Sequence, residues 1–129
     1  MNHHDLIIEA ARSWARGSYP MEAAVELLIH HGTWLRRPDF QTLAVDLEEP
    51  FAVIDWQAVH NALTRGHLPC SRGEDAMLRI ALSIAYALPV ELGPALTILD
   101  ATNLGYVVAA VRHAAGNRAA WVPVQGGPA

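Results

Sequence analysis

Apolar residues recur at helical spacing along almost the whole chain, and glycine, proline and helix-capping residues interrupt this pattern at short intervals. Side chains that recur every three or four residues share one face of a helix, so each segment can bury one stripe against its neighbours. The 129 residues match the length of one compact domain. The sequence therefore predicts a single all-α bundle of five to seven helices over residues 1–116, followed by a flexible C-terminal tail over residues 117–129.

The interruptions give approximate bounds for each helix. Helices are expected over residues 5–16, 18–31, 39–47, 56–65, 72–88, 94–99 and 101–115. The strongest local signal is Ser71-Arg72-Gly73-Glu74, which matches a capping box, where a serine and a glutamate each satisfy a free backbone N–H. Phe51–Ile54 fits either a short extended segment or buried coil.

Apolar stripes mark the faces that we expect to point into the core. These faces are Ile7, Ala10, Ala11 and Trp14 in the first helix, Met21, Val25, Leu28 and Ile29 in the second, and Leu104, Val107, Val108 and Val111 in the last. The helix over residues 72–88 is apolar nearly all round, which is typical of the central helix of a bundle.

Composition excludes several classes of protein. Hydrophobic residues make up 52% of the chain and charged residues 17%, which is unlike the composition of a disordered protein. No apolar run is long enough to cross a bilayer and no signal peptide is visible, so we expect a cytoplasmic protein with no membrane partner. The single cysteine, Cys70, excludes an internal disulfide.

The charge pattern disfavours nucleic acid as a partner. Acidic residues outnumber basic ones by 13 to 9, which gives a formal net charge of -4, and every basic residue is an arginine. The arginines are scattered, whereas nucleic-acid-binding proteins gather basic residues on one face to neutralise several phosphates.

Several segments resemble a known family. Gly17–Ile29, Glu74–Ala85, Leu99-Asp100 and His113–Gly116 are similar to segments of small uncharacterised all-α proteins encoded by actinobacteria. The resemblance covers about residues 5–116 and is weakest over residues 34–54. It implies a stand-alone domain in a bacterial cytoplasm, and it implies no activity, cofactor or catalytic residue.

One alternative function is a small metal-dependent or acid–base enzyme. Glu22, Glu26 and His30 are spaced four residues apart on one edge of the second helix, and His60 could join them from another helix. However, the chain contains no Glu-x-x-His pattern and no His-Glu-x-x-His motif. His30 and its neighbour His31 are better explained by the last helical turn, where a partial positive charge complements the helix dipole. We therefore expect no resident cofactor.

Nucleophilic catalysis has little support in the sequence. Cys70 precedes the Ser71 cap, and a thiol close to a helix N-terminus can be reactive, with His67 as a nearby base. No family signature surrounds the pair, and a single cysteine is usually a small apolar residue.

Another alternative is a DNA-associated regulator with a helix-turn-helix over Pro94–Gly116. A recognition helix needs polar and basic side chains near its N-terminal end. The last helix offers Thr102 and Asn103 there and is apolar afterwards, which is ordinary for a bundle.

The leading hypothesis is a non-enzymatic interaction or regulatory module that binds a protein partner or forms a homodimer. The candidate contact residues are Trp34, Arg36, Arg37 and Trp121, because tryptophan and arginine are enriched in interface hot spots. Trp34 lies in a poorly patterned segment and is expected to resist burial. Trp121 either docks on a partner or packs on its own bundle, and acidic Asp46, Glu48 and Glu49 would help to select the partner.

Overall fold

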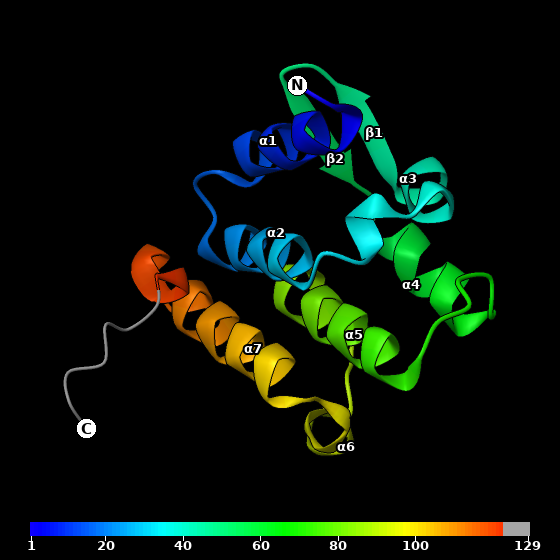
Figure 1. The fold of residues 1–129 in the computed structure, drawn as a ribbon, viewed down its shortest axis with the longest axis vertical. Coiled ribbons are helices and arrows are strands. Elements are labelled where there is room, and N and C mark those ends of the chain that lie inside the picture. The colour runs from blue at the N-terminus through cyan, green and yellow to red at the C-terminus, as the bar shows by residue number, and fades with distance from the viewer. Residues whose placement is uncertain (123–129) are drawn as a thin grey trace.

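Helices form most of the computed structural model, which describes residues 1–122 (Figure 1). In chain order the elements are α1 (His3–Ala15), α2 (Tyr19–His31), the 3₁₀ turn η1 (Trp34–Arg36), α3 (Pro38–Ala44), β1 (Val45–Glu48), β2 (Phe51–Ile54), α4 (Trp56–Thr64), α5 (Arg72–Tyr86), α6 (Leu92–Ile98), α7 (Ala101–Ala114) and the 3₁₀ turn η2 (Arg118–Trp121). The predicted helical fold is confirmed, with one small hairpin in addition. None of the described helices has the length and hydropathy needed to cross a membrane.

Local capping interactions explain where the main helices begin and end. The capping box at the start of α5 is present: Ser71 Oγ accepts from the Glu74 N–H at 3.1 Å, and Glu74 Oε1 accepts from the Ser71 N–H at 2.8 Å. Asp55 and Asp100 are the N-caps of α4 and α7, and each side chain accepts from the backbone N–H three residues later. Gly32 ends α2 with a φ of 81°, a left-handed conformation that glycine adopts without strain.

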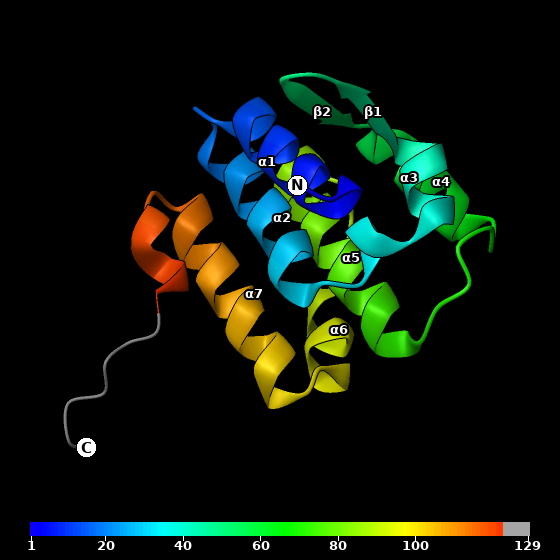
Figure 2. The same cartoon turned by 45° about the horizontal axis from the view of Figure 1, so that its top comes forward.

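Two helices, α2 and α5, form the centre of the molecule. They pack against each other, α2 also contacts α1 and α7, and α5 also contacts α4, α6 and α7 (Figure 2). Each buries a continuous set of side chains: Ala23, Ala24, Val25, Leu27 and Leu28 from α2, and Ala76, Met77, Leu78, Ile80, Ala81 and Leu82 from α5. The central place expected for the helix that starts at Arg72 is thus correct.

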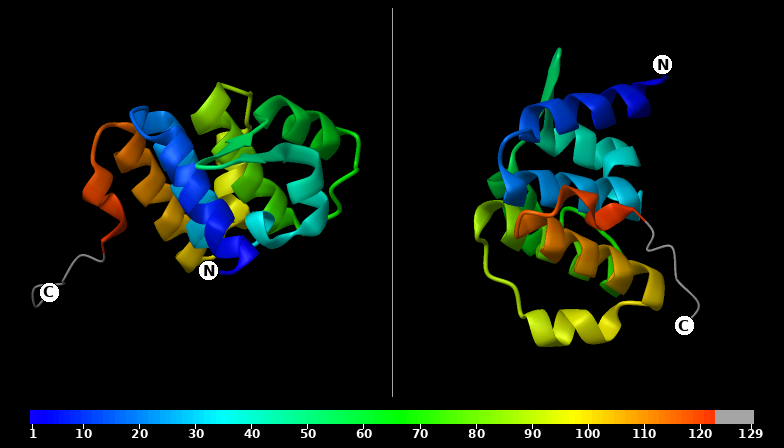
Figure 3. Two further views of the ribbon diagram at one scale, coloured as in Figure 1. Left: turned by 90° about the horizontal axis from the view of Figure 1, so that it is seen from above. Right: turned by 90° about the vertical axis from the view of Figure 1, so that its left-hand side faces the viewer.

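The helix expected over residues 39–47 is wrong for its last three residues, 45–47. α3 ends at Ala44, and the chain continues as β1, which pairs antiparallel with β2. Residues 45–48 alternate, with Asp46 and Glu48 exposed and their two apolar neighbours partly buried, which is the two-residue period of a strand rather than a helical stripe. The opposite face of the hairpin lies against α1 (Figure 3).

The face that α7 buries also differs from the prediction. Of the four residues expected in the core, Val107 is buried, whereas Leu104, Val108 and Val111 are exposed. The side that faces the bundle instead carries Ala109, Ala110 and His113. Small side chains allow α7 to approach α2 closely, and His113 hydrogen-bonds to α2, so tertiary contacts rather than hydropathy set the rotation of the helix.

Candidate interaction surface

The outer side of α7 carries an apolar surface that no helix or strand among residues 1–122 covers. Leu104, Val108 and Val111 are 40%, 41% and 57% exposed, and their spacing of four and three residues places them in one row. Figure 1 shows α7 along one edge of the molecule, with α2 and α5 on its inner side. Isolated exposed apolar residues are ordinary, but a contiguous row is typical of an interaction site. We call these three residues the α7 row.

A groove of about 580 Å³ runs beside the α7 row. Gly105 and Tyr106 of α7 line it, together with His30, Trp121 and Val122 from outside α7. A Cβ atom placed on Gly105 would have no neighbour within 4 Å, so this glycine leaves open space on the helix surface. Together, the α7 row and the groove form one surface that extends from α7 to the place where α7, α2 and η2 meet.

A partly buried polar cluster holds η2 in place beside this groove. The Glu22 carboxylate accepts hydrogen bonds from His113 Nε2 at 2.9 Å, from Arg118 Nε at 2.8 Å and Nη2 at 3.0 Å, and from the Gly17 N–H at 2.8 Å. These bonds, led by the Arg118 guanidinium, lower the pKa of Glu22 to about 2. The Arg118 guanidinium also lies over the Tyr19 ring, 4.4 Å from its centroid.

Trp121 completes the cluster and fixes the protonation of His113. Trp121 Nε1 donates to His113 Nδ1 at 2.8 Å, and an indole nitrogen can only donate. Nδ1 is therefore unprotonated, and the proton on Nε2 points at Glu22. The Trp121 ring stacks on His30 with centroids 4.4 Å apart, while His30 Nδ1 donates to the Glu26 carbonyl.

The polar groups of this cluster bind one another and connect several elements. Every strong polar group in it has a partner within the protein, and a carboxylate with a pKa of about 2 is a weak base at neutral pH. A cavity of about 280 Å³ adjoins the cluster, and Arg12 on its rim already forms a two-bond ion pair with Glu26, at 2.8 and 2.9 Å. The cluster links α1, α2, α7 and η2 through side chains.

The structure does not assemble the four candidate metal ligands. Glu22 and Glu26 form ion pairs with arginines, and His30 stacks on Trp121, whereas His60 lies on α4. Within residues 1–122, no group of three His, Cys, Asp or Glu side chains is placed to hold a metal ion. The spacing of Glu22, Glu26 and His30 indicated a polar edge of α2 correctly, but its partners come from α1, α7 and η2.

Trp34 and Arg37 have internal roles that the sequence did not indicate. The expectation that Trp34 resists burial is wrong: its ring is fully buried and its Nε1 donates to the Glu74 carbonyl at 3.1 Å. Arg37 lies over this ring, 4.6 Å from the centroid, and binds both Asp39 and the Pro69 carbonyl. Arg36 is exposed.

Trp121 lies at the end of η2 rather than in a tail. The predicted tail over residues 117–129 begins too early, because residues 118–121 form a turn that packs on α7. Its remaining part, residues 123–129, lies outside the described residues.

The other catalytic candidates gain no support from their surroundings. Burial, with Asp75 and Glu74 nearby, raises the pKa of the Cys70 thiol, which makes it less reactive than a free cysteine.

The helix-turn-helix alternative places its recognition helix at α7. Thr102 lies in the first turn of α7, and the exposed surface that follows is the α7 row. This surface is apolar where a DNA-reading helix would be polar.

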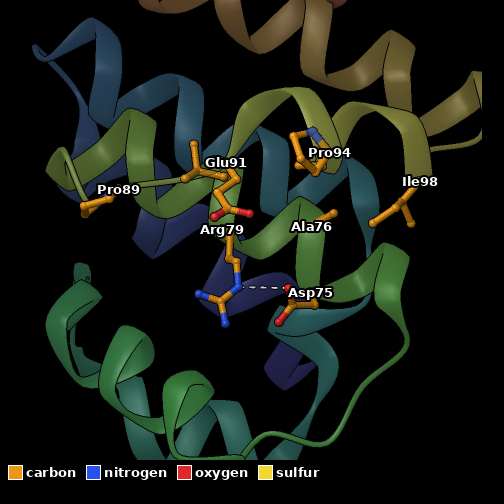
Figure 4. Close-up of a pocket in the computed structure, with 9 residues that line it drawn as sticks. Asp75, Ala76, Arg79, Pro89, Glu91, Pro94 and Ile98 are labelled. Atoms are coloured by element: carbon orange, nitrogen blue, oxygen red, sulfur yellow. Dashed lines mark hydrogen bonds and ion pairs between the residues drawn. The ribbon is translucent and has the colours of Figure 1, made fainter.

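A further cavity of about 500 Å³ lies between α5 and α6 (Figure 4). Figure 4 shows Asp75 and Arg79 of α5 joined on one wall, with Pro94 and Ile98 of α6 on the other. The Asp75–Arg79 ion pair, at 2.9 Å, connects residues one helical turn apart, so it stabilises α5 itself.

Comparisons with protein-family models, curated proteins and solved structures find no match to this chain. The resemblance to actinobacterial proteins therefore stays a prediction. The α7 row was visible in the sequence as an apolar stripe, but only the position of α2 decides which side of that stripe is buried.

Proposed function

We propose that this protein is a non-enzymatic helical interaction module that acts as a homodimer, with the α7 rows of two copies packed against each other. One observation carries the proposal: three large apolar side chains form a row on a helix whose other side is already occupied by the bundle. Burial of such a row removes apolar surface from water, which is the main driving force of association.

The row is complementary to itself in the antiparallel direction. When two α7 helices are aligned antiparallel about Tyr106, Leu104 of one copy lies opposite Val108 of the other. The same alignment places Asp100, the N-cap of α7, opposite Arg112 in its last turn. A twofold symmetric dimer makes each of these pairs twice, which is why a second copy explains the surface better than an unrelated partner.

The dimensions of the surface suit a dimer of modest stability. α7 has 14 residues and is therefore about 21 Å long. A stable interface needs about 800 Å² on each partner, which is more than one helix row supplies. The adjacent groove, with His30, Trp121 and Val122 on its wall, would contribute the remaining area.

The mass of the protein in solution tests this proposal. We expect the wild type to have twice the mass of one chain in sedimentation equilibrium or native mass spectrometry at micromolar concentration. Leu104→Glu should produce a monomer, because it places two carboxylates inside the apolar contact. Leu92→Glu is the matched control: Leu92 is also an exposed leucine, at the first position of α6, where a glutamate suits the helix dipole.

Two results would overturn the proposal. A monomeric wild type would mean that something other than a second copy covers the α7 row. A dimer that survives Leu104→Glu but is lost in Leu92→Glu would place the interface on α6. Circular dichroism of each variant would confirm that the helices are retained.

A further inference from the structure

A cavity of about 610 Å³ lies where the hairpin meets α3 and α4. Three aromatic rings contribute to its wall, from Trp14, Trp56 and Tyr86. The two tryptophan rings stack with centroids 6.4 Å apart, and Trp56 Nε1 is bonded to Met21 Sδ, so the indoles are fixed in place. Tyr86 is 54% exposed at the end of α5 and Trp14 is partly exposed, whereas Trp56 is buried, so solvent reaches the rings of Tyr86 and Trp14.

The charged groups that line this cavity are all acidic. They are Asp46 and Asp55, and no arginine or histidine lines it. The cavity between α5 and α6, the cavity beside Glu22 and the groove beside the α7 row each have an arginine in the wall, namely Arg79, Arg118 and Arg112. Unlike those three, this cavity has two carboxylates and no positively charged side chain in its wall, which favours a cation.

Both carboxylates have acceptor capacity to spare. Asp55 uses Oδ1 to cap α4, where it accepts from the Ala58 N–H at 3.0 Å. Asp46 forms no ion pair or side-chain hydrogen bond with any of residues 1–122. Asp46 pairs with Val53 in the hairpin and Asp55 follows β2 directly, so both aspartates belong to the end of the hairpin that borders the cavity.

We propose that this cavity binds a substituted ammonium ion, with its alkyl groups against the aromatic rings and its charge balanced by Asp46 and Asp55. Aromatic faces attract cations that carry a diffuse charge, and a nearby carboxylate adds a direct Coulomb attraction. A neutral ligand of the same shape would gain only the apolar contact. Charge is therefore the property that distinguishes the proposed ligand, and the site is independent of the α7 row.

Choline and its neutral isostere, in which a tert-butyl group replaces the trimethylammonium group, test this directly. We expect choline to quench tryptophan fluorescence and to shift the amide NMR signals of the hairpin and the start of α4. The isostere should bind at least about tenfold more weakly. Equal binding of the two compounds, or no binding of choline at millimolar concentration, would overturn the proposal.

Variants on the wall then locate the ligand. Asp46→Asn keeps the shape of the side chain and should weaken choline binding about fivefold. Glu48→Gln removes a charge from the same face of the hairpin but outside the cavity wall, so it serves as the matched control. Tyr86→Ala should also weaken binding, whereas Tyr86→Phe retains the ring and should not. An Asp46→Asn effect no larger than that of Glu48→Gln would mean that choline responds only to overall charge.

Discussion

The Glu22 carboxylate connects α2 to three other parts of the chain. Its carboxylate, on the first turn of α2, binds the Gly17 N–H before the helix, His113 on α7 and Arg118 on η2. The Glu22 side chain is 11% exposed and its bond to His113 is partly buried, whereas Arg118 reaches it from the solvent side. Charge-assisted bonds of this kind are stronger than neutral ones, and the low pKa of Glu22 follows from them.

The pH dependence of unfolding tests the role of Glu22. Its pKa falls from an ordinary 4.5 to about 2 on folding, so its contribution is complete above pH 4.5 and is lost as the pH falls from 4.5 to 2. We expect Glu22→Gln to lower the free energy of unfolding at neutral pH by about 1–2 kcal/mol. The variant should also lose less stability than the wild type between pH 4.5 and 2.

Urea unfolding followed by circular dichroism across this pH range measures both effects. Glu48→Gln is the control, because Glu48 is exposed on the hairpin and forms no ion pair within residues 1–122. Parallel pH profiles for the wild type and Glu22→Gln would show that the carboxylate does not stabilise the fold.

The turn η2 depends on side-chain contacts, because a four-residue 3₁₀ turn has little stability of its own. Three contacts hold it: Arg118 binds Glu22, Trp121 Nε1 donates to His113, and the Trp121 ring stacks on His30. Together they position one wall of the groove beside the α7 row.

Trp121→Phe separates two of these contacts. Phenylalanine can still stack on His30 but cannot donate to His113 Nδ1, which would be left buried without a partner. We expect a loss of about 1–2 kcal/mol in the free energy of unfolding, measured by circular dichroism in urea. Trp121→Ala removes the stacking as well and should cost more. Equal stability of Trp121→Phe and the wild type would mean that the indole N–H contributes nothing.

Elements whose ends are marked by local chemistry could be predicted from the sequence. Ser71 with Glu74, Asp55 and Asp100 each form their bonds within three residues, so the starts of α5, α4 and α7 follow from the sequence alone. The change from α3 to β1 was missed: the alternation of residues 45–48 covers only four residues, and the pairing of β1 with β2 and the cover from α1 decide it.

The polar cluster and the α7 row depend on contacts that are distant in sequence. Glu22 and His113 are 91 residues apart, and either side chain alone is equally compatible with a helix-dipole or metal-binding role. From the sequence, Leu104, Val108 and Val111 are expected in the core. In the structure, the contact between α7 and α2 leaves them on the outer side of the helix. Hydropathy identified the residues, but tertiary packing assigned their environment.

At the scale of the whole molecule, the two proposed sites lie on different edges of one core. The hairpin and α7 are separated by the central helices α2 and α5 (Figure 1), so one surface can pair copies while the other stays open to solvent. The formal net charge of -4 per copy opposes association over long distances. A dimer therefore needs local charge complementarity, which the proposed antiparallel alignment would supply through Asp100 and Arg112.

This alignment can be tested by coupling the two charges. Arg112→Glu would place a carboxylate opposite Asp100 twice in each dimer and should weaken dimerisation about threefold to tenfold at low salt. Asp100→Ser removes the negative charge and retains a side-chain oxygen that can cap α7.

In the double variant Asp100→Ser/Arg112→Glu, the new carboxylate at position 112 has no negative charge opposite it. Arg112→Glu should therefore raise the dimer dissociation constant clearly less in the Asp100→Ser background than in the wild-type background. Arg36→Glu, another exposed arginine exchange, controls for the change in net charge. Dimer dissociation constants from sedimentation equilibrium at two salt concentrations measure the coupling. Strictly additive effects would reject the antiparallel alignment of α7, while the dimer itself would still be tested by Leu104→Glu.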